Sequence, residues 1–292
     1  MDKWPNLFIV GAPKTGTTFL HYYLKAHPQI FMSTMKEPNY FSQNFVSTKY
    51  SGKTIRDTNN YLSLFHKVKD EKFVGESSVS YLSIPEVSQI ISKKIPNARI
   101  IISLRDPVER MFSAYLMHQK FNNLNPIFYE EIKNEMEHFD ENIYPRLLRN
   151  GLYYDDVKNY LDTFGKKQVK ILIFENWIKN PKNVIQEICE FLNVKNSLKN
   201  FEAESYNKYI PTTPRGTLGE FFLKKGIGNY KIKKILPSSA KQFIANNILS
   251  KPITKLKMTI NERNMLINFY QKDVKKLEKL LDCKLLWPNF KD

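Results

Sequence analysis

Residues Phe8 to Leu20 read FIVGAPKTGTTFL, an apolar run that passes through a glycine-containing turn into a helical pattern. A buried strand that leads directly into a helix gathers backbone N–H groups and the positive end of the helix dipole at one point. Gly11 and Gly16 have the spacing of a phosphate-binding loop, but Thr17 stands where that loop has its lysine. The lysine comes earlier, at Lys14. This stretch predicts an anion site of unusual construction.

The same strand-to-helix order returns twice further along the chain. The run ARIIISLRD leads into DPVERMFSAYLMHQKF, where Asp106 has the place of an N-cap, Pro107 the first helical position and Glu109 the third, as in a capping box. In VKILIFENWIKNPKNVIQEICEFL, Asn180 and Pro181 begin a helix in the same way. Three such junctions favour a doubly wound parallel sheet over a barrel or an all-helical fold.

The predicted fold class is therefore α/β, a P-loop-like doubly wound parallel sheet flanked by helices, with a helical C-terminal extension. We expect a single domain over residues 1–292, with a core of about 5–195 and a loop or lid with C-terminal helices over about 196–292. The stretch 127–164 is expected to be mostly helical. The segment TINERNMLINFYQKDVKKLEKLL predicts a long amphipathic helix that packs back on the sheet.

The composition limits the classes of partner. Lys and Arg number 45 against 29 acidic residues, a net charge of +16, which predicts attraction to a polyanion such as a charged nucleotide or an acidic polysaccharide. The two cysteines, Cys189 and Cys283, form no metal or disulfide pattern. The chain has no apolar run near the length of about 18 residues that a membrane span needs, so we expect no transmembrane segment and a cytoplasmic location.

The candidate anion site has two parts. The loop offers the positive charge of Lys14, close backbone approach at Gly16, and donors at Thr15, Thr17 and Thr18. The run RIIISL ends in Arg105 instead of a metal-holding aspartate, since the following Asp106 serves as a helix cap. An arginine at this strand end predicts a second anionic group to neutralise. Together these features indicate a nucleotide with phosphates at two places, bound without a required metal.

The motifs PKTGTT and LRDPVERMFSAY, about ninety residues apart, resemble those of the sulfotransferases that use 3′-phosphoadenosine 5′-phosphosulfate, in the bacterial and carbohydrate (heparan-sulfate-sulfotransferase-like) branch. The resemblance implies that the loop from Lys14 to Thr18 cradles the 5′-phosphosulfate, and that Arg105 and Ser113 hold the 3′-phosphate. It further implies that 3′,5′-adenosine bisphosphate is the product and that no metal is required.

The segment STMKEPNYF is similar to the one in that branch whose glutamate deprotonates the acceptor, which implies that Glu37 is the catalytic base and that Lys14 assists the leaving phosphate. Glu76 is the competing base. The branch often has a lysine after this second glutamate, whereas this chain has Ser77 and Ser78. The resemblance implies a carbohydrate or glycolipid acceptor, acidic glycans included, that is sulfated on a hydroxyl or an amine.

Several interpretations stay open at this point. Phe174 either packs near the adenine or belongs to a strand core, and Lys224, Lys225 and Gly226 either close over the 3′-phosphate or form a solvated basic loop. No histidine has a position that indicates catalysis. The alternatives to carbohydrate sulfation are sulfation of a small molecule or lipid, a metal-dependent nucleotide kinase with an atypical loop, and a non-enzymatic polyanion binder. No nucleic-acid-binding module is present in the sequence, so nucleic acid is not an expected partner.

Overall fold

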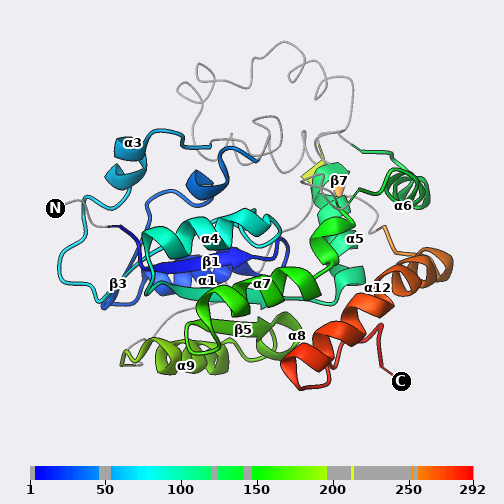
Figure 1. Cartoon of the computed structure of the whole chain (residues 1–292). Helices are drawn as coiled ribbons and strands as arrows, with labels where there is room; N and C mark the ends of the chain where they lie inside the picture. Colours follow the sequence, from blue (N-terminus) through cyan, green and yellow to red (C-terminus); the bar gives the residue numbers. More distant parts are fainter. Residues whose placement is uncertain are drawn as a thin grey trace, which may run out of the picture.

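The computed structural model describes residues 4–45, 54–119, 124–140, 147–195, 212–213, 251–252 and 256–291. Its centre is a five-stranded sheet with the strand order β2-β3-β1-β4-β5, in which every pair of neighbours is parallel (Figure 1). The strands are β1 (Leu7–Gly11), β2 (Ile30–Met32), β3 (Phe73–Ser77), β4 (Arg99–Leu104) and β5 (Val169–Ile173). A short antiparallel pair joins β6 (Thr212–Thr213) to β7 (Lys251–Pro252). The predicted doubly wound parallel sheet is confirmed.

Helices flank both faces of this sheet (Figure 1). In chain order, the first helices are α1 (Thr17–Lys25), η1 (Tyr40–Ser42), α3 (Thr58–Ser63), α4 (Pro85–Lys94) and α5 (Pro107–His118). The following ones are α6 (Phe128–Glu137), η3 (Arg149–Gly151), α7 (Tyr154–Phe164), α8 (Phe174–Trp177), α9 (Pro181–Leu192) and α12 (Ile260–Leu281). The described parts of the stretch 127–164 are mostly helical, as expected.

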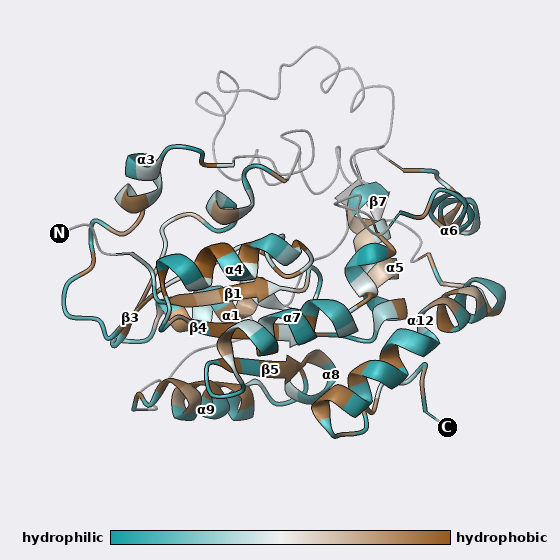
Figure 2. Ribbon diagram, viewed as in Figure 1, coloured by the Kyte–Doolittle hydropathy of each residue, from teal (hydrophilic) through white to brown (hydrophobic). Residues whose placement is uncertain are grey.

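Alternating residues of β1 supply the two halves of the core. Leu7 and Ile9 pack with the apolar sides of α1 and α9, whereas Phe8 and Val10 pack on the other side with those of α4, α5, α7 and α12. This is the period of two expected for a strand, and here both sets are apolar because helices cover both faces. Figure 2 shows the sheet as a hydrophobic layer and the helices with hydrophilic outer surfaces.

The helix that follows β1 lies on the opposite face from the helices that follow β3 and β4. Since β1 lies between β3 and β4, its carboxyl end is the point where the chain connections diverge. Open α/β sheets bind their ligands at such a point. The loop 12–16 starts there, so the fold places the predicted anion site at the topological switch point of the sheet.

The C-terminal helix α12 differs from its prediction. It packs against α5, α6 and α7 (Figure 1), so these helices and not the sheet itself provide its main contacts. Its start is well defined, because Thr259 and Glu262 form a complete capping box. Its buried residues, among them Leu266, Tyr270 and Leu277, recur at helical spacing and join the core on the α4 and α7 side. Burial of this stripe fixes the helix to the domain.

The start of α5 is partly as predicted. Asp106 is the N-cap, and its carboxylate accepts hydrogen bonds from the backbone N–H groups of Val108 and Glu109. The prediction that Glu109 completes a capping box is wrong, because its carboxylate binds Arg263 of α12 at 2.7 Å. The N–H of Asp106 donates instead to Glu175 Oε1 at 3.1 Å. A tertiary ion pair has therefore replaced a local cap.

At α9, Asn180 holds the N-cap position and Pro181 the first helical position, as predicted, but no side-chain hydrogen bond forms at this cap. Cys189 is buried in the apolar face of α9, and Cys283 is exposed. The predicted lid over residues 196–211 and 214–218, and the basic residues Lys224, Lys225 and Gly226, lie outside the described part of the chain.

Candidate active site

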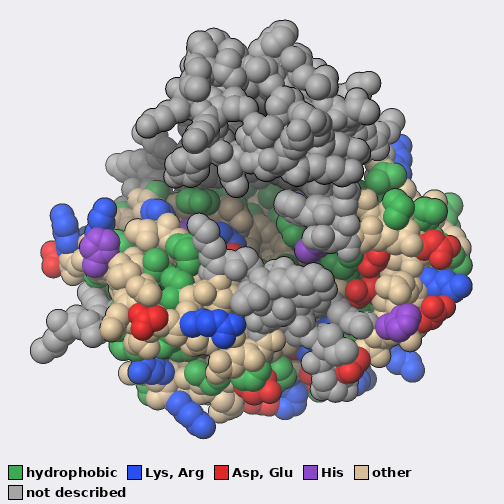
Figure 3. Space-filling model, turned by 90° about the horizontal axis from the view of Figure 1, so that it is seen from above, with side chains coloured by type: hydrophobic (Ala, Val, Ile, Leu, Met, Phe, Trp, Pro, Cys, Tyr) green, Lys and Arg blue, Asp and Glu red, His purple; other side chains and the backbone are tan. Residues whose placement is uncertain are grey.

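Seen from above, the molecule has a hollow near its centre, bordered by hydrophobic side chains and a histidine (Figure 3). The residues predicted to bind and react follow the carboxyl ends of three strands of the sheet. The loop 12–16 follows β1, Arg105 follows β4, and Glu37 follows β2 and donates its N–H to the Ser77 carbonyl at the end of β3. Parallel strands bring these three chain segments to one edge of the sheet.

The loop after β1 is held by bonds to itself and to β4. The Thr15 hydroxyl donates to the Ala12 carbonyl at 2.7 Å, while the Ser103 hydroxyl donates to the Thr15 carbonyl at 2.8 Å. The Ala12 N–H donates to the Ser103 carbonyl at 2.7 Å. The side chain of Thr15 thus shapes the loop from within, and its backbone N–H is the group that can serve a ligand.

Gly16 is the point where the loop turns into α1. Its φ of 80° lies in the left-handed region, and a Cβ built on it would lie 2.4 Å from a ring carbon of Trp177. Thr17 and Thr18 follow as the first residues of α1, the former buried and the latter exposed. Glycine is therefore required here both for the backbone conformation and for the close approach of α8. The N–H groups of this first helical turn have no acceptor within the helix, so they favour an anion.

Lys14 lies at the outer part of the loop and also has a left-handed backbone, with φ at 69°. Its Nζ lies 3.6 Å from the sulfur of Met117, in the last turn of α5. Burial and the charge of Lys14 both lower the pKa of His118 on the same helix. The His118 ring is therefore neutral near pH 7, and Lys14 provides the positive charge at this edge of the loop.

Arg105 meets the loop directly. Its Nη1 donates to the carbonyl of Lys14 at 3.2 Å, and its guanidinium lies over the Phe174 ring, 4.9 Å from the centroid. Arg105 Nε is buried and has no hydrogen-bond partner among the described residues. Phe174 begins α8 directly after β5, supports the arginine and also packs against the core, while its contact with the adenine stays a prediction. The guanidinium retains donor capacity for a ligand beside the loop.

Ser113 lies two turns into α5, as predicted, and is half-buried. It lies four residues before Met117, so both side chains are on one side of the helix. Met117 contacts Lys14. The side of α5 that carries Ser113 therefore faces the loop that contains Lys14. Arg105 directly precedes the N-cap of the same helix.

Glu37 lies on the β3 side of the loop. Its backbone is left-handed, with φ at 59°, and its N–H donates to the Ser77 carbonyl at 2.9 Å. One carboxylate oxygen accepts the Val79 N–H at 2.9 Å, and the other binds the ammonium group of Lys36. The Glu37 side chain is 31% exposed. The carboxylate is thus both oriented by the protein and open to a second molecule.

Glu76, the competing base, is fully buried. Its carboxylate accepts hydrogen bonds from Tyr61 at 2.7 Å, Tyr81 at 2.8 Å and Ser78 at 2.6 Å. Burial raises the pKa of Glu76 to about 7 against the opposing effect of these donors. A carboxylate enclosed by three hydroxyl groups has no access to a substrate. Glu76 is a structural centre, and Glu37 is the accessible carboxylate.

Hydrogen bonds connect the buried Glu76 network to the turn that contains Glu37. The Ser78 hydroxyl accepts the Asn39 N–H at 3.1 Å, and the Asn39 amide donates to the Glu37 carbonyl at 3.0 Å. Ser80 donates to the other end of the Asn39 amide at 2.8 Å. Because Asn39 is also left-handed, with φ at 52°, these bonds stabilise a turn that the backbone alone would disfavour.

His21 was not predicted as part of this region. It projects from α1, is buried, and its Nδ1 lies 2.9 Å from the Ser77 hydroxyl. Burial lowers the pKa of His21 to about 4, with further contributions from Lys36 and Lys25. The imidazole is therefore neutral at pH 7 and serves as a hydrogen-bond partner of Ser77. Nothing in the sequence around His21 marks this contact, because its partner is 56 residues away.

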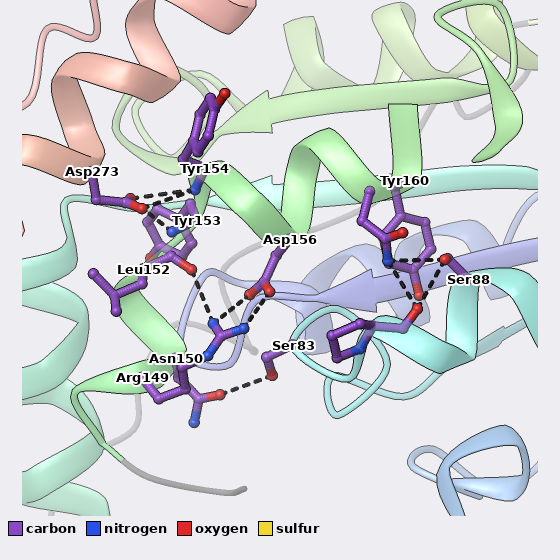
Figure 4. A network of polar contacts seen from close by, with 12 residues as sticks. Ser83, Ser88, Arg149, Asn150, Leu152, Tyr153, Tyr154, Asp156, Tyr160 and Asp273 are labelled. Atoms are coloured by element: carbon purple, nitrogen blue, oxygen red, sulfur yellow. Dashed lines mark hydrogen bonds and ion pairs between the residues drawn. The ribbon is translucent and has the colours of Figure 1, made fainter. Parts of the chain in front are cut away.

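The segment before α7 holds Arg105 from behind. The Tyr153 hydroxyl donates to the Arg105 carbonyl at 3.0 Å. Figure 4 shows how Tyr153 itself is fixed: its N–H and that of Tyr154 donate to Asp273 of α12, and the neighbouring Arg149 forms an ion pair with Asp156. The site therefore depends on contacts between α7, α12 and the end of β4.

Two further observations concern the described residues as a whole. They contain no cluster of three or more His, Cys, Asp or Glu side chains with the geometry to hold a metal ion. None of their helices combines the length and the apolar character that a membrane span requires.

The chain can now be compared with known proteins. The sulfotransferase domain family model matches residues 5–246. The chain therefore belongs to the sulfotransferase domain family. The family and the enzyme class expected from the sequence are confirmed.

The solved structure of a sulfotransferase from Alicyclobacillus acidocaldarius is similar over nearly all of both chains. It is 31% identical, covers 97% of this chain and 98% of that chain, and gives a TM-score of 0.72. Mouse sulfotransferase SULT7A1, solved in complex with PAP, has a TM-score of 0.53 and 13% identity, with 97% and 90% of the two chains covered. The second likeness concerns the fold alone.

Curated relatives include two human proteins. Carbohydrate sulfotransferase 15 is 28% identical over 245 residues, which are 65% of this chain and 44% of the human protein. Bifunctional heparan sulfate N-deacetylase/N-sulfotransferase 3 is 27% identical over 221 residues, which are 71% of this chain and 24% of the human protein. The chain thus covers less than half of the length of these relatives.

Proposed function

We propose that this protein transfers a sulfuryl group from 3′-phosphoadenosine 5′-phosphosulfate to a hydroxyl group of a carbohydrate, with an amine as the less favoured acceptor. One observation carries the proposal: two cationic residues, Lys14 and Arg105, lie at the end of β1, where Arg105 Nη1 donates to the backbone carbonyl of Lys14 at 3.2 Å. A donor with a phosphosulfate at one end and a 3′-phosphate at the other requires two such groups. A nucleoside triphosphate needs only one continuous phosphate cradle.

Each residue then has a distinct role. Lys14 and the N–H groups from Thr15 to Thr18 bind the 5′-phosphosulfate and stabilise the charge on the departing phosphate. Arg105 and Ser113 bind the 3′-phosphate. A requirement for metal does not follow from this arrangement, so sulfuryl transfer without metal stays a prediction, tested by activity in the presence of a chelator.

Glu37 receives the proton of the acceptor. In the transfer step the acceptor oxygen forms a bond to sulfur, the bond from sulfur to the bridging phosphate oxygen breaks, and the acceptor proton moves to the Glu37 carboxylate. The contacts of this carboxylate with Val79 and Lys36 hold it in place before the acceptor arrives. Alignment of the acceptor oxygen, the sulfuryl group and the Glu37 carboxylate is the larger part of the protein's contribution to the rate.

Two observations support a carbohydrate acceptor. The named relatives include a carbohydrate sulfotransferase and a heparan sulfate N-sulfotransferase. In addition, Tyr40 follows the Glu37 turn and stacks on Tyr61 at 4.2 Å between ring centroids, in a cluster with Trp4 and Phe41. Phe41 and Tyr61 are buried and support the partly exposed rings of Tyr40 and Trp4, and such rigid rings beside a base suit the apolar faces of sugars. A cytoplasmic location stays a prediction, to be tested by cell fractionation.

Nucleotide binding tests the donor assignment. We expect 3′,5′-adenosine bisphosphate to raise the melting temperature without magnesium and ATP with magnesium to leave it unchanged. Lys14→Ala and Arg105→Ala should each abolish the rise. Matched controls are Lys25→Ala, at the other end of α1, and Arg99→Ala, at the other end of β4, which should keep it. Stabilisation by ATP and magnesium alone would favour a nucleotide kinase.

Turnover tests the base. Glu37→Gln should bind 3′,5′-adenosine bisphosphate as the wild type does, because the glutamine oxygen can still accept the Val79 N–H. Its rate of sulfuryl transfer to a panel of glycans, followed with radiolabelled donor, should fall by about 100-fold or more, the usual contribution of a general base. A Glu37→Gln variant that retains full activity would show that the base lies elsewhere.

A further inference from the structure

The chain beyond α12 reaches the residues that flank Arg105. The Asn289 side-chain amide donates to Asp106 Oδ2 at 2.8 Å, and its backbone N–H donates to the same oxygen at 3.1 Å. Asp106 is fully buried, and its other oxygen caps α5. Asp106 directly follows Arg105 in the sequence. A segment from the far end of the chain therefore holds the residue next to the arginine.

A second contact comes from the same segment. Trp287 is fully buried and packs on the Tyr153 ring, with 5.9 Å between centroids and 57° between planes. The hydroxyl of Tyr153 donates to the Arg105 carbonyl at 3.0 Å. The Arg105–Asp106 peptide unit is thus held on one side through the Tyr153 hydroxyl and on the other through the Asp106 carboxylate. Both supports rest on residues 287–289.

The segment is itself anchored to α5 and α12. Arg263 Nη1 donates to Glu109 Oε1 at 2.7 Å and also to the side-chain oxygen of Asn289. This fixes the orientation of the Asn289 amide, so that its NH₂ group points to Asp106. A carboxylate that accepts four N–H donors in a buried place has little freedom to move.

We propose that Asn289 and Trp287 are positioning residues for Arg105, and that the C-terminal segment thereby sets the affinity for the 3′-phosphate of the donor. This inference rests on the proposed function, in which Arg105 binds that phosphate. The proposal assigns neither residue a contact with the nucleotide. Their effect passes through the peptide unit between Arg105 and Asp106, whose position decides where the guanidinium can reach.

The test compares two nucleotides that differ only in the 3′-phosphate. Binding of 3′,5′-adenosine bisphosphate and of adenosine 5′-phosphate is measured by calorimetry. For Asn289→Ala we expect about tenfold weaker binding of the bisphosphate, the loss typical of hydrogen bonds to a charged group, and less than about twofold for the monophosphate. The matched control is Leu286→Ala, whose side chain is 67% exposed in the same segment and which should change neither affinity.

A double-variant cycle separates positioning from general support. In the Arg105→Lys background, Asn289→Ala should have no further effect on the bisphosphate, because the group that it positions is already lost. Arg263→Ala, which frees the Asn289 amide without touching Asp106, should have a smaller effect of the same kind and covers the case that Asn289→Ala does not fold. Equal weakening of both nucleotides, or no change for either, would overturn the inference.

The outcomes also separate this inference from the proposed function. If the wild-type protein binds the two nucleotides equally, and Arg105→Lys makes no difference, then the assignment of the 3′-phosphate to Arg105 is wrong and the inference falls with it. If the wild type prefers the bisphosphate through Arg105 but Asn289→Ala keeps that preference, the proposed function stands and only the positioning role is refuted.

Discussion

The ion pair between Arg149 and Asp156 stands almost entirely out of solvent, with side-chain exposures of 9% and 3%. Two parallel hydrogen bonds join the groups at 2.9 and 2.6 Å, and Arg149 also donates to the Leu152 carbonyl (Figure 4). Asp156→Ala leaves the guanidinium buried without its carboxylate. Loss of one partner from such a pair destabilises a fold by about 3 to 5 kcal/mol.

A second ion pair on the same helix gives the control. Lys158 and Asp162 pair on the outer side of α7, with side-chain exposures of 45% and 60%. Asp162→Ala should therefore lower the free energy of unfolding far less than Asp156→Ala does. Both variants remove a paired aspartate from α7. The two pairs differ in burial, and Asp156 also lies in the first turn of the helix whereas Asp162 lies in the last.

The assay is urea unfolding at pH 8.5, with the free energy of unfolding as the measured quantity. The alkaline pH matters because burial raises the pKa of Asp156 to about 7, although Arg149 acts in the opposite direction. At pH 8.5 the carboxylate is ionised and the pair is complete. An Asp156→Ala loss below about 1 kcal/mol, or one equal to that of Asp162→Ala, would refute the argument from burial.

The apolar replacement of both partners sharpens the result. In Arg149→Met with Asp156→Leu no charge remains buried, so this double variant should be more stable than either single variant. The measured coupling between the two sites then gives the energy of the pair itself. If the double variant loses the sum of the two single losses, the side chains act independently and the ion pair is not what stabilises this part of α7.

Three further predictions concern the loop, the buried network and the C-terminal helix. Gly16→Ala should abolish nucleotide-induced stabilisation, because the new methyl group meets Trp177, whereas Gly165→Ala has a similar φ of 75° but no atom within 4 Å and should cost only the conformational strain. Glu76→Gln should become more stable relative to the wild type as the pH rises from 4.5 to 7, by up to about 3 kcal/mol at equilibrium unfolding. The pKa of the Glu76 carboxyl is higher in the folded than in the unfolded protein, so this carboxyl stabilises the wild type below its unfolded pKa, and the stabilisation is lost as the pH rises through its folded pKa. Parallel plots of unfolding free energy against pH for the two proteins would contradict this. Thr259→Ala removes the capping box of α12 and should lower the melting temperature in proportion to about 1 kcal/mol, while an unchanged transition would mean that packing alone starts the helix.

The parts of the fold that could be predicted are those in which neighbouring residues carry the signal. β1 with its loop, and β4 with the start of α5, are each written within about fifteen residues, as an apolar run followed by glycine or by an Asp-Pro cap. The three-residue strand β2 was missed, because Ile30–Met32 is too short to show a period. Lys14, Arg105 and Glu37 could be proposed as site residues from the sequence, because each belongs to a short motif.

The parts that could not be predicted depend on contacts between distant residues. Glu109 has the spacing of a capping box, but Arg263, 154 residues later, offers a charged partner and takes its carboxylate. The pattern around Glu76 likewise leaves its role open, and only the fold shows that Tyr61 and Tyr81 enclose it. A local pattern states what a side chain can do, and the tertiary neighbours decide which of those bonds forms.

The arrangement of the strands explains how donor and acceptor can be handled by separate parts of one edge. Arg105 continues β4, Glu37 is bonded to the end of β3, and β1 with its loop lies between them. On the proposed function, the sulfuryl group therefore passes over the end of β1 from a donor held on the β4 side to an acceptor activated on the β3 side. The supports are separate as well, because the Glu76 network holds the Glu37 turn while Tyr153 and Asn289 hold the Arg105 junction. Changes behind Arg105 should accordingly alter donor affinity without altering the base, and changes around Glu76 should do the reverse.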